Sequence, residues 1–599
     1  MTDDVHEPLS LYRDRLKDEH AKNTSTFFEA LVQRSGVNEQ ANRDTVAAIR
    51  LLETQLEKNS SSRSRWKFLR VLTILLLAAA IAVIGLFFWR LASPESMLLA
   101  PGFAGLSTSI ATLVATILFL TKKLNPAILA LDEHLARLKE KHAATTREAW
   151  EQLTPLNRLY DWGMIAKIIR QTVPRLALDP FFSCARLNEL RESFGWNNDF
   201  NDDKSVLFAQ SGEINGNPFA LAETLDFHWA EKTWHGSLSI QWLELESHTD
   251  SNGRKHTHWV TRTQTLHASI TKPAPDYTRQ KFLIYGNEAA PDLTFSRSPS
   301  SHSGPGDGFL DKWRMKRTIQ KLEKFSRNLD DDSGYTIMSN REFDALFLAT
   351  NRNHEIQFRV LFTPLAQQQM VALLKDRIIG FGDDFHFVKS RMINLVQPAH
   401  LTGMDITAAP DLFKNYDLDD ARRFFNSYSN DYFKHFYFTL APLLTIPLYQ
   451  QHRSHADIYK DVHGKTASFW EHEAIANFHG QNAFRHKKSI TQNILKTRSD
   501  NSGRIAVTAH GFRGEERVEY VKMLGGDGRW HNVPVPWTEY LPVQHTTPMT
   551  IRETDGLTLQ DFEQHAQTAP DWQSFLRDNR INLNHVTFRR SIASIVWKT

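Results

Sequence analysis

Histidines gather between residues 452 and 486, and this is the stretch whose residue types could bind a metal ion. Neutral imidazoles and carboxylates are both ligands for zinc and related ions. A zinc-protease helix, however, needs a second histidine four residues after the first, and Ala476 occupies that position after His472. We therefore predict no metal site and no cofactor, and we name His463, His472 and His479 as the candidate metal ligands.

Three other motifs resemble catalytic signatures, but each lacks an essential part. Gly464-Lys465-Thr466 resembles the end of a phosphate-binding loop, yet Tyr459 stands where the loop needs its first glycine. Gly382-Asp383-Asp384 resembles the metal-binding turn of polymerases without a second acidic motif, so we expect a β-turn there. No Gly-x-Ser-x-Gly nucleophile elbow occurs. The sequence thus names no catalytic residue and favours a non-enzymatic protein, with a metal-dependent hydrolase built on residues 452–486 as an alternative.

The composition indicates a reducing compartment and argues against a nucleic-acid partner. The 599 residues hold 71 Lys and Arg against 68 Asp and Glu, a net charge of +3, so the chain lacks the broad basic field of nucleic-acid-binding proteins. The single cysteine, Cys184, excludes an intramolecular disulfide and suits a reducing compartment. Hydrophobic residues make up 41%, which is enough for a large core. We predict no nucleic-acid partner.

Two uncharged runs near the N-terminus predict a membrane hairpin. Residues 71–89 contain no charge, and at ~1.5 Å per helical residue they span roughly 29 Å, the thickness of a bilayer core. A second uncharged run covers residues 96–121. We therefore predict a transmembrane hairpin over 66–123, with spans at about 68–90 and 97–121, and the lipid bilayer as a partner.

Flanking charges predict how this hairpin is oriented. Four basic residues precede the first run and two follow the second, whereas Arg90 in the connecting turn is balanced by Glu95. The positive-inside rule then places both termini in the cytoplasm. Small residues at four-residue spacing in the second run, such as Ala111 and Ala115, suit close helix packing. They leave open a homo-oligomer through the second span.

The segments on either side of the hairpin read as helices. Residues 1–65 form a cytoplasmic helical segment with a break at Ser35-Gly36. After the hairpin, Ile128, Leu131, Leu135 and Leu138 repeat at three and four residues, the spacing of an amphipathic helix. Because both segments leave the membrane side by side, we predict a helical stalk over 124–178.

The period changes to that of β-strands from Ser205 onward. Short alternating runs as far as Arg297 are separated by turn signals such as Asn215-Gly216, which predicts strands joined by hairpins. A linker at 298–308 precedes a basic helix over 311–327 with the apolar stripe Met315, Ile319 and Leu322. That helix packs on the domain or lies on the anionic inner leaflet. We expect a β-rich α+β domain over 179–402.

Residues 339–401 carry two local motifs, an acidic–Phe pair at Glu342-Phe343 and an aromatic–Thr-Pro turn at Phe362-Thr363-Pro364. In these motifs, and in the preceding stalk and hairpin, residues 60–402 resemble the DUF3137 family of bacterial membrane proteins of unknown function. The resemblance implies a two-span protein of the bacterial inner membrane and supplies no catalytic residues. From the residues themselves, we expect a strand over 355–362 and a helix that starts at Pro364, with Thr363 as its N-cap.

The remaining region, 403–599, starts with an aromatic helix near 418–448 and continues as an α+β region. The predicted fold class is α+β: a helical stalk and a two-span hairpin followed by mixed β-rich and α cytoplasmic lobes. The predicted function is an inner-membrane-anchored cytoplasmic interaction or sensor protein with an unknown protein partner. The alternative is a membrane effector, of the defence or toxin type, whose hairpin oligomerises and perturbs the bilayer on a cytoplasmic signal.

Overall fold

The computed structural model describes residues 7–91, 100–197, 203–249, 255–300, 309–327, 335–451, 466–499, 504–554, 557–578 and 580–597. The chain is a mixed α+β protein, about 50% helix and 29% strand, as the sequence predicts. It divides into two compact units: Phe27–Tyr160 with Pro410–Asn426, and Met1–Thr26 with Asp161–Ala409 and Ser427–Thr599. Both units join segments that are far apart in the sequence, whereas the domains predicted above are consecutive segments.

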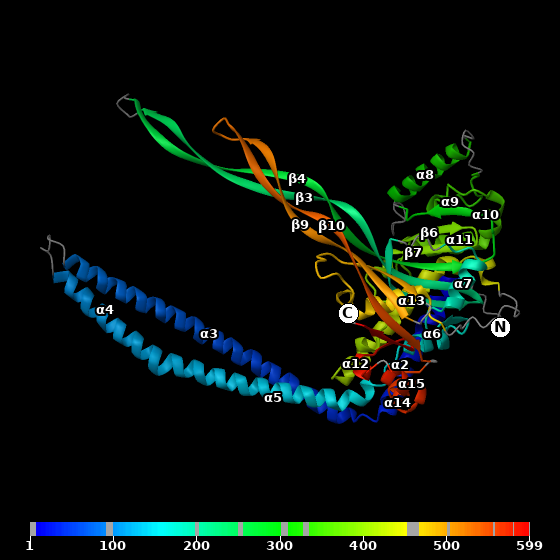
Figure 1. Cartoon of the computed structure of the whole chain (residues 1–599), viewed down its shortest axis with the longest axis horizontal. Helices are drawn as coiled ribbons and strands as arrows, with labels where there is room; N and C mark the ends of the chain where they lie inside the picture. The colour runs from blue at the N-terminus through cyan, green and yellow to red at the C-terminus, as the bar shows by residue number, and fades with distance from the viewer. Residues whose placement is uncertain are drawn as a thin grey trace. The chain divides into compact units, whose positions relative to one another are not determined.

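Long antiparallel helices dominate the first of these units (Figure 1). They are α3 (Glu39–Leu91), α4 (Ala100–Phe119), the π-helical turn η2 (Leu120–Leu124) and α5 (Asn125–Asn157). The Gln152 amide of α5 donates to the Thr45 hydroxyl of α3 over 2.9 Å, and Arg63 of α3 forms an ion pair with Asp132 of α5. These contacts confirm the predicted pairing of the segments that flank the two apolar runs.

The local sequence explains where these helices start and bend. Helix α2 (Lys17–Ser35) ends at the predicted break, where Gly36 has a φ of +66°. Ile128, Leu135 and Leu138 are buried, as predicted for the stripe of α5. The π-helical turn η2 ends two residues before Pro126, whose missing N–H cannot continue the regular ladder.

Two helices in the described part of the chain are long and apolar enough to cross a membrane: Glu39–Leu86 and Thr108–Asn157. Only 11% and 17% of their most apolar windows are buried. Large apolar side chains therefore stand exposed, including Leu75 at 61% and Leu118 at 47%. A core helix of a soluble protein would bury such residues.

A seven-stranded antiparallel sheet forms the centre of the second unit, in the order β1-β2-β3-β4-β7-β6-β5. Its strands are β1 (Leu176–Leu178), β2 (Lys204–Ile214), β3 (Asn217–Thr249), β4 (Lys255–Gly286), β5 (Thr294–Arg297), β6 (Phe385–Ser390) and β7 (Ile393–Pro398). Helices α7 (Cys184–Glu192) and α13 (Phe469–His479) pack on it: Leu190 and Trp470 share a core with Ala220 and Phe282. The predicted turn at Asn215-Gly216 is present, with φ of +54° and +77°.

The β3 and β4 strands correct one prediction. Several short strands are expected between residues 205 and 297, but β3 and β4 run without a break for 33 and 32 residues. The ladder pairs Thr233 with Thr271 and continues through the polar stretches that read as gaps between strands. Pairing with a partner strand outweighs the weak local strand propensity of those stretches.

A second, five-stranded sheet has the order β11-β12-β10-β9-β8. Its strands are β8 (Ile494–Ser499), β9 (Arg504–Leu524), β10 (Trp530–Glu553), β11 (Thr587–Arg589) and β12 (Ile592–Val596). Helix α13 also contributes to the core beneath this sheet, where Ile475 contacts the cluster around Leu495 and Val507. One helix therefore joins the cores of both sheets.

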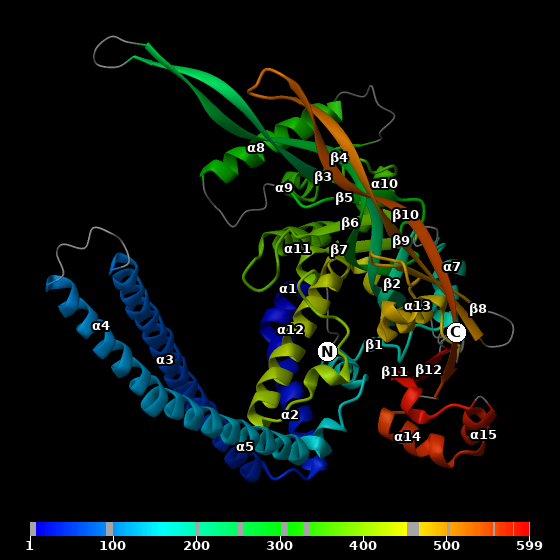
Figure 2. The same cartoon turned by 60° about the vertical axis from the view of Figure 1, so that its left-hand side comes forward.

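The long hairpins β3–β4 and β9–β10 run side by side and pack face to face (Figures 1 and 2). Ile240 and Leu266 on the inner face of the first hairpin contact Val533 and Val535 of the second. A Cβ at Gly236 would overlap the carbonyl oxygen of Pro534, so a glycine is required for this close approach. The outer face of β3–β4 carries exposed residues, mostly Thr and Ser.

The prolines of β4 are all at odd-numbered positions and those of β10 are all at even-numbered positions, so the prolines of each strand lie along a single edge. Pro273 and Pro275 occupy β4, and Pro534, Pro536, Pro542 and Pro548 occupy β10. Alternate N–H groups of a strand point to opposite edges, and both inner ladders pair without a register shift. The missing N–H groups therefore all fall on the edge that faces away from the hairpin partner.

Shorter helices surround the sheets. They are α1 (Pro8–Leu11), the π-helical turn η1 (Tyr12–Leu16), α6 (Met164–Thr172), α8 (Phe309–Arg327), α9 (Arg341–Phe347), α10 (Glu355–Leu361), α11 (Pro364–Lys375), α12 (Leu418–Leu444), α14 (Leu559–Thr568) and α15 (Pro570–Asp578). The N-cap at Thr363 is confirmed, since its hydroxyl accepts from the Ala366 N–H. The apolar stripe of α8 packs on the domain, as its packing alternative predicts: Leu322 is buried, and Met315 and Ile319 are half-buried in the same cluster.

The predicted strand over 355–362 is wrong, because those residues form helix α10. The His354 side chain caps this helix by accepting from the Gln357 N–H, and Glu355 pairs with Arg359 one turn later. Phe358, three residues after Glu355, is fully buried. The cap and the turn-spaced pairs outweigh the β-branched and aromatic residues that favour a strand.

Candidate functional site

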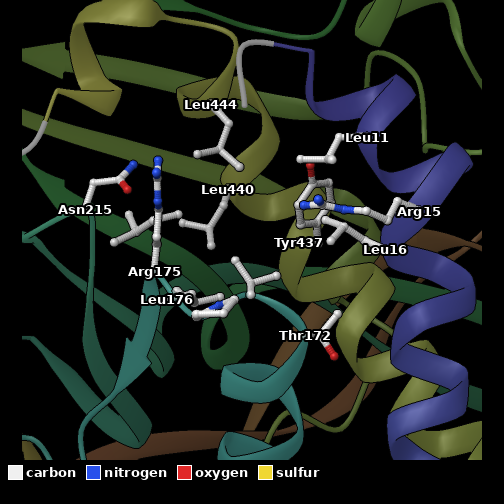
Figure 3. Close-up of a pocket in the computed structure, with 13 residues that line it drawn as sticks. Leu11, Arg15, Leu16, Thr172, Arg175, Leu176, Asn215, Tyr437, Leu440 and Leu444 are labelled. Carbon is white, nitrogen blue, oxygen red and sulfur yellow. The ribbon is translucent and has the colours of Figure 1, made fainter. Parts of the chain in front are cut away.

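A cavity of about 130 Å³ opens among four segments of the second unit (Figure 3). Its wall comes from α1 and η1, from the link between α6 and β1, from the β2–β3 turn, and from α12. The lining residues are Leu11, Arg15, Leu16, Thr172, Val173, Pro174, Arg175, Leu176, Ile214, Asn215, Tyr437, Leu440 and Leu444.

The floor of the cavity is apolar. Helix α12 supplies Tyr437, Leu440 and Leu444, whose spacing of three and four residues places them on one face. All three are nearly fully buried, as is Leu176 opposite. The Tyr437 hydroxyl donates to the Pro8 carbonyl over 2.9 Å, and burial raises the pKa of Tyr437, so this phenol stays neutral.

Two guanidinium groups stand at the cavity. Arg15 reaches from η1 toward Tyr437, and Arg175 rises beside Asn215 (Figure 3). The Arg15 Nε lies 3.9 Å from Glu19, whereas the lining itself includes no Asp or Glu. The charged side chains that line the cavity are therefore two arginines above an apolar floor, and Arg15 is paired with Glu19.

Asn215 leaves a hydrogen-bond acceptor unused at the cavity wall. It is the first residue of the β2–β3 turn, in the left-handed conformation, and only 5% of it is exposed. Its backbone N–H donates to the Arg175 carbonyl over 3.2 Å. Its side-chain Oδ1 is buried and has no hydrogen-bond partner among the described residues. A buried acceptor without a donor costs free energy on folding, so such atoms are rare in folded proteins.

A neutral histidine supports the cavity wall from behind. His20 Nδ1 lies 3.1 Å from the Thr172 hydroxyl, and Nε2 lies 3.2 Å from the Ser429 carbonyl, so Nε2 carries the proton and donates. The ring stacks on Phe433 at 4.1 Å. Burial lowers the pKa of His20 to about 4. This histidine fixes Thr172 without a charge of its own.

A second cavity, of about 540 Å³, lies where the two long hairpins leave the sheets. Phe227, Tyr277 and Phe512 line it, together with Lys496 and His510. The Lys496 ammonium is bound by Glu473 at 2.8 Å, and burial together with Lys496 lowers the pKa of His510. The cation that lines this second cavity is therefore already paired with a carboxylate.

The candidate metal ligands do not form a site among the described residues. His463 lies outside those residues, as do His452 and His455. His472 and His479 both belong to α13, and burial lowers the pKa of each to about 4. No group of three or more His, Cys, Asp or Glu in the described part of the chain is arranged to hold a metal.

Each described neighbour of those histidines has a structural partner. His479 contacts the hydroxyls of Ser594 at 2.9 Å and Thr587 at 3.2 Å. Glu471 forms a buried ion pair with Arg589, and Glu473 accepts from the Val206 N–H over 3.0 Å. These side chains join α13 to both sheets.

The Gly382-Asp383-Asp384 segment is likewise structural. Asp383 pairs with the buried Arg297, and Asp384 Oδ2 lies 2.6 Å from His400 Nδ1. The other nitrogen of His400 lies 3.0 Å from the His435 carbonyl, and Phe381 stacks on the ring at 4.0 Å. Neither carboxylate is left to bind a metal ion.

The chain matches no family model, no curated protein and no solved structure. The resemblance to the DUF3137 family therefore stays a prediction. Sequence reasoning did not identify Arg15, Arg175 or Asn215 as site residues. The only signal was the Asn215-Gly216 turn, because nothing local indicates that η1, β1 and α12 meet.

Proposed function

We propose that the chain is an inner-membrane-anchored cytoplasmic interaction or sensor protein of bacteria, without catalytic activity, and that the 130 Å³ cavity is its sensing site. The exposed apolar surface of α3 and α4 is the observation that carries the proposal. Each large apolar side chain gains about 1.5–3 kcal/mol on leaving water, so a row of them on a bare helix calls for a nonaqueous surrounding.

The flanking charges supply the orientation. Arg63, Arg65, Lys67 and Arg70 precede the first apolar run, and Lys122 and Lys123 follow the second. Because cytoplasmic loops are enriched in Lys and Arg, the units that follow the hairpin are cytoplasmic in this proposal. The paired helices α3 and α5 then connect the membrane spans to the rest of their unit.

Membrane extraction with matched variants tests the anchor. Leu75→Arg with Leu118→Arg puts one charge in each apolar run, at about 2.5–3.5 kcal/mol per charge. We expect carbonate-washed bacterial membranes to lose this variant and to retain the unmodified chain. The control is Leu51→Arg with Leu129→Arg, which changes exposed leucines of α3 and α5 outside the runs. Recovery of the unmodified chain in the soluble fraction would overturn the proposal.

One observation supports the effector alternative. Ala111 and Ala115 of α4 are exposed and are not covered by α3. A small-residue face of this kind lets a second copy approach closely. Ala111→Cys in a Cys184→Ser background would crosslink between copies in membranes if the spans associate, whereas a cysteine at Ile117, which is exposed on a different face of α4, serves as the control. Equal crosslinking at both positions would remove this alternative.

A further inference from the structure

We propose that the outer face of the β9–β10 hairpin binds the headgroup region of a lipid bilayer. This face points away from β3–β4, and near the free end of the hairpin it carries four large apolar side chains (Figure 1). They are Val518, Tyr520, Leu524 and Trp530, which are between 53% and 69% exposed. The contact goes beyond the proposed anchor, because it lies in the other unit and uses no residue of α3 or α4.

The strand register places these four side chains on one face. Leu524 pairs directly with Trp530, and Tyr520 pairs with Pro534. Side chains two residues apart on a strand point to the same face, so the even-numbered positions of this hairpin share a face. Val533, at an odd-numbered position, is buried in the core between the two hairpins. The even-numbered face is therefore the outer one, and its apolar residues form one patch.

The charges of this face favour a lipid surface. Along residues 518–524 and 530–536, Lys522 is the only charged residue at an even-numbered position. Glu519 points to the other face, where it pairs with Lys272 of β4 at 2.6 Å. Exposed Trp and Tyr side chains beside a lysine are typical of protein segments that lie among lipid headgroups, where the cation approaches the phosphates. No carboxylate of this stretch of the face opposes that approach.

The turn at the free end holds the surface in shape. The Gly525 N–H donates to the Arg529 carbonyl over 2.8 Å, and Asp527 accepts from the Arg529 N–H over 3.1 Å. The Gly526 N–H donates to the Gln264 side chain of β4 over 2.7 Å, which joins this end to the neighbouring hairpin. Asp527 and Arg529 also cancel in charge. The patch is thus presented on a fixed backbone, so binding requires little ordering of the chain.

A second copy of the chain fits this face less well than a bilayer does. In a symmetric dimer the same patch lies on both sides of the interface, and the centre of this patch is the Lys522–Asn532 pair, so two lysines would meet. The patch also has only four outward side chains on each strand. A stable protein interface takes about 20–30 residues on each side.

Quenching by spin-labelled lipid tests the contact in the full-length chain. An environment-sensitive fluorophore is attached to Asn532→Cys in a Cys184→Ser background, which leaves the four apolar side chains in place. The protein is reconstituted in vesicles of phosphatidylethanolamine and phosphatidylglycerol, all of which carry a nitroxide next to the headgroup. We expect the fluorophore to lose about half of its emission or more, since interfacial segments lie ~5–10 Å deep in the headgroup and acyl boundary. The same fluorophore on Thr265→Cys, at an exposed position of the outer face of β3–β4, should keep its emission.

Paired variants assign the quenching to the patch. Leu524→Ser with Trp530→Ser should abolish quenching at position 532. The control is Leu245→Ser with Trp259→Ser, which removes an equally paired and exposed Leu–Trp pair from the outer face of β3–β4 and should leave the quenching unchanged. Equal losses in the two variants, or quenching that survives the first, would overturn the proposal. Disulfide crosslinking of Asn532→Cys between copies would assign the face to a second copy instead.

Carbonate extraction of the same vesicles separates this contact from the anchor. An anchored chain without quenching at position 532 rejects the hairpin contact alone. A chain that carbonate removes, although its fluorophore is quenched before the wash, rejects the anchor alone.

Discussion

The Arg297 guanidinium and the Asp383 carboxylate form an ion pair in which neither side chain is accessible to solvent, with 2.6 Å between Nη2 and Oδ1. Arg297 also donates to the carbonyls of Phe347 and Phe385, and Asp383 accepts from the Ser300 N–H. One buried pair thus ties β5 to α9 and β6. Burial lowers the pKa of Arg297, while Asp383 opposes that shift.

Breaking this pair from one side should destabilise the chain strongly. Asp383→Ala leaves a buried guanidinium uncompensated, and we expect a loss of about 3–5 kcal/mol in the free energy of unfolding by urea. The double variant Arg297→Met with Asp383→Leu should recover most of that loss. Asp420→Ala removes the exposed pair with Arg423 and should change stability by less than about 0.5 kcal/mol. Equal effects of Asp383→Ala and Asp420→Ala would contradict the role given to the buried pair.

Gly236→Ala should separate the two long hairpins. The added Cβ would overlap the backbone at Pro534, so the facing strands must move apart. We expect faster hydrogen exchange in residues 231–245 and 517–537, measured by mass spectrometry. Gly403→Ala is the control, because a Cβ there meets nothing within 4 Å. Unchanged exchange in both variants would show that the hairpins do not depend on this contact.

Stability should fall as the pH falls from about 6.5 toward 4. Burial lowers the pKa of His20, His472 and His479 to about 4, below the unfolded value of about 6.5. In this window the unfolded chain binds protons that the folded chain does not, which favours unfolding by about 1.4 kcal/mol per pH unit for each histidine. His20→Leu should make the pH dependence of urea unfolding shallower by that amount. If the pH dependence of unfolding is unchanged in His20→Leu, groups other than His20 take up the protons.

Restoring N–H groups on the free edge of β4 should promote aggregation. Pro273→Thr with Pro275→Thr adds two donors to a stretch of the outward β4 edge that no described strand pairs with, since β7 pairs only with Leu283–Gly286. We expect more turbidity and thioflavin binding on mild heating. Thr278→Ser, on the same strand, should behave as the unmodified chain does. A soluble double variant would show that these prolines do not protect the edge.

Elements set by local patterns were predictable from the sequence. The helix break at Gly36, the stripe of α5 and the cap at Thr363 depend on residues within one or two turns of each other. The unbroken β3 and β4 strands depend on pairing partners many residues away. Helix α10 has local signals, the His354 cap and the Glu355–Arg359 pair, which the prediction of a strand from β-branched and aromatic residues overlooked. The cavity could not be predicted from any local sequence pattern, because Arg15, Arg175 and Asn215 come to line it only after the whole unit has folded.

The proline-lined edges also limit how another protein can recognise the hairpins. Strand addition, in which an incoming peptide extends a sheet through main-chain hydrogen bonds, needs a regular row of donors. The outward edges of β4 and β10 interrupt that row. A partner that binds there must read side chains, such as the Thr and Ser ladder of the outer face, so its recognition would depend on the sequence of the hairpins rather than on their backbone.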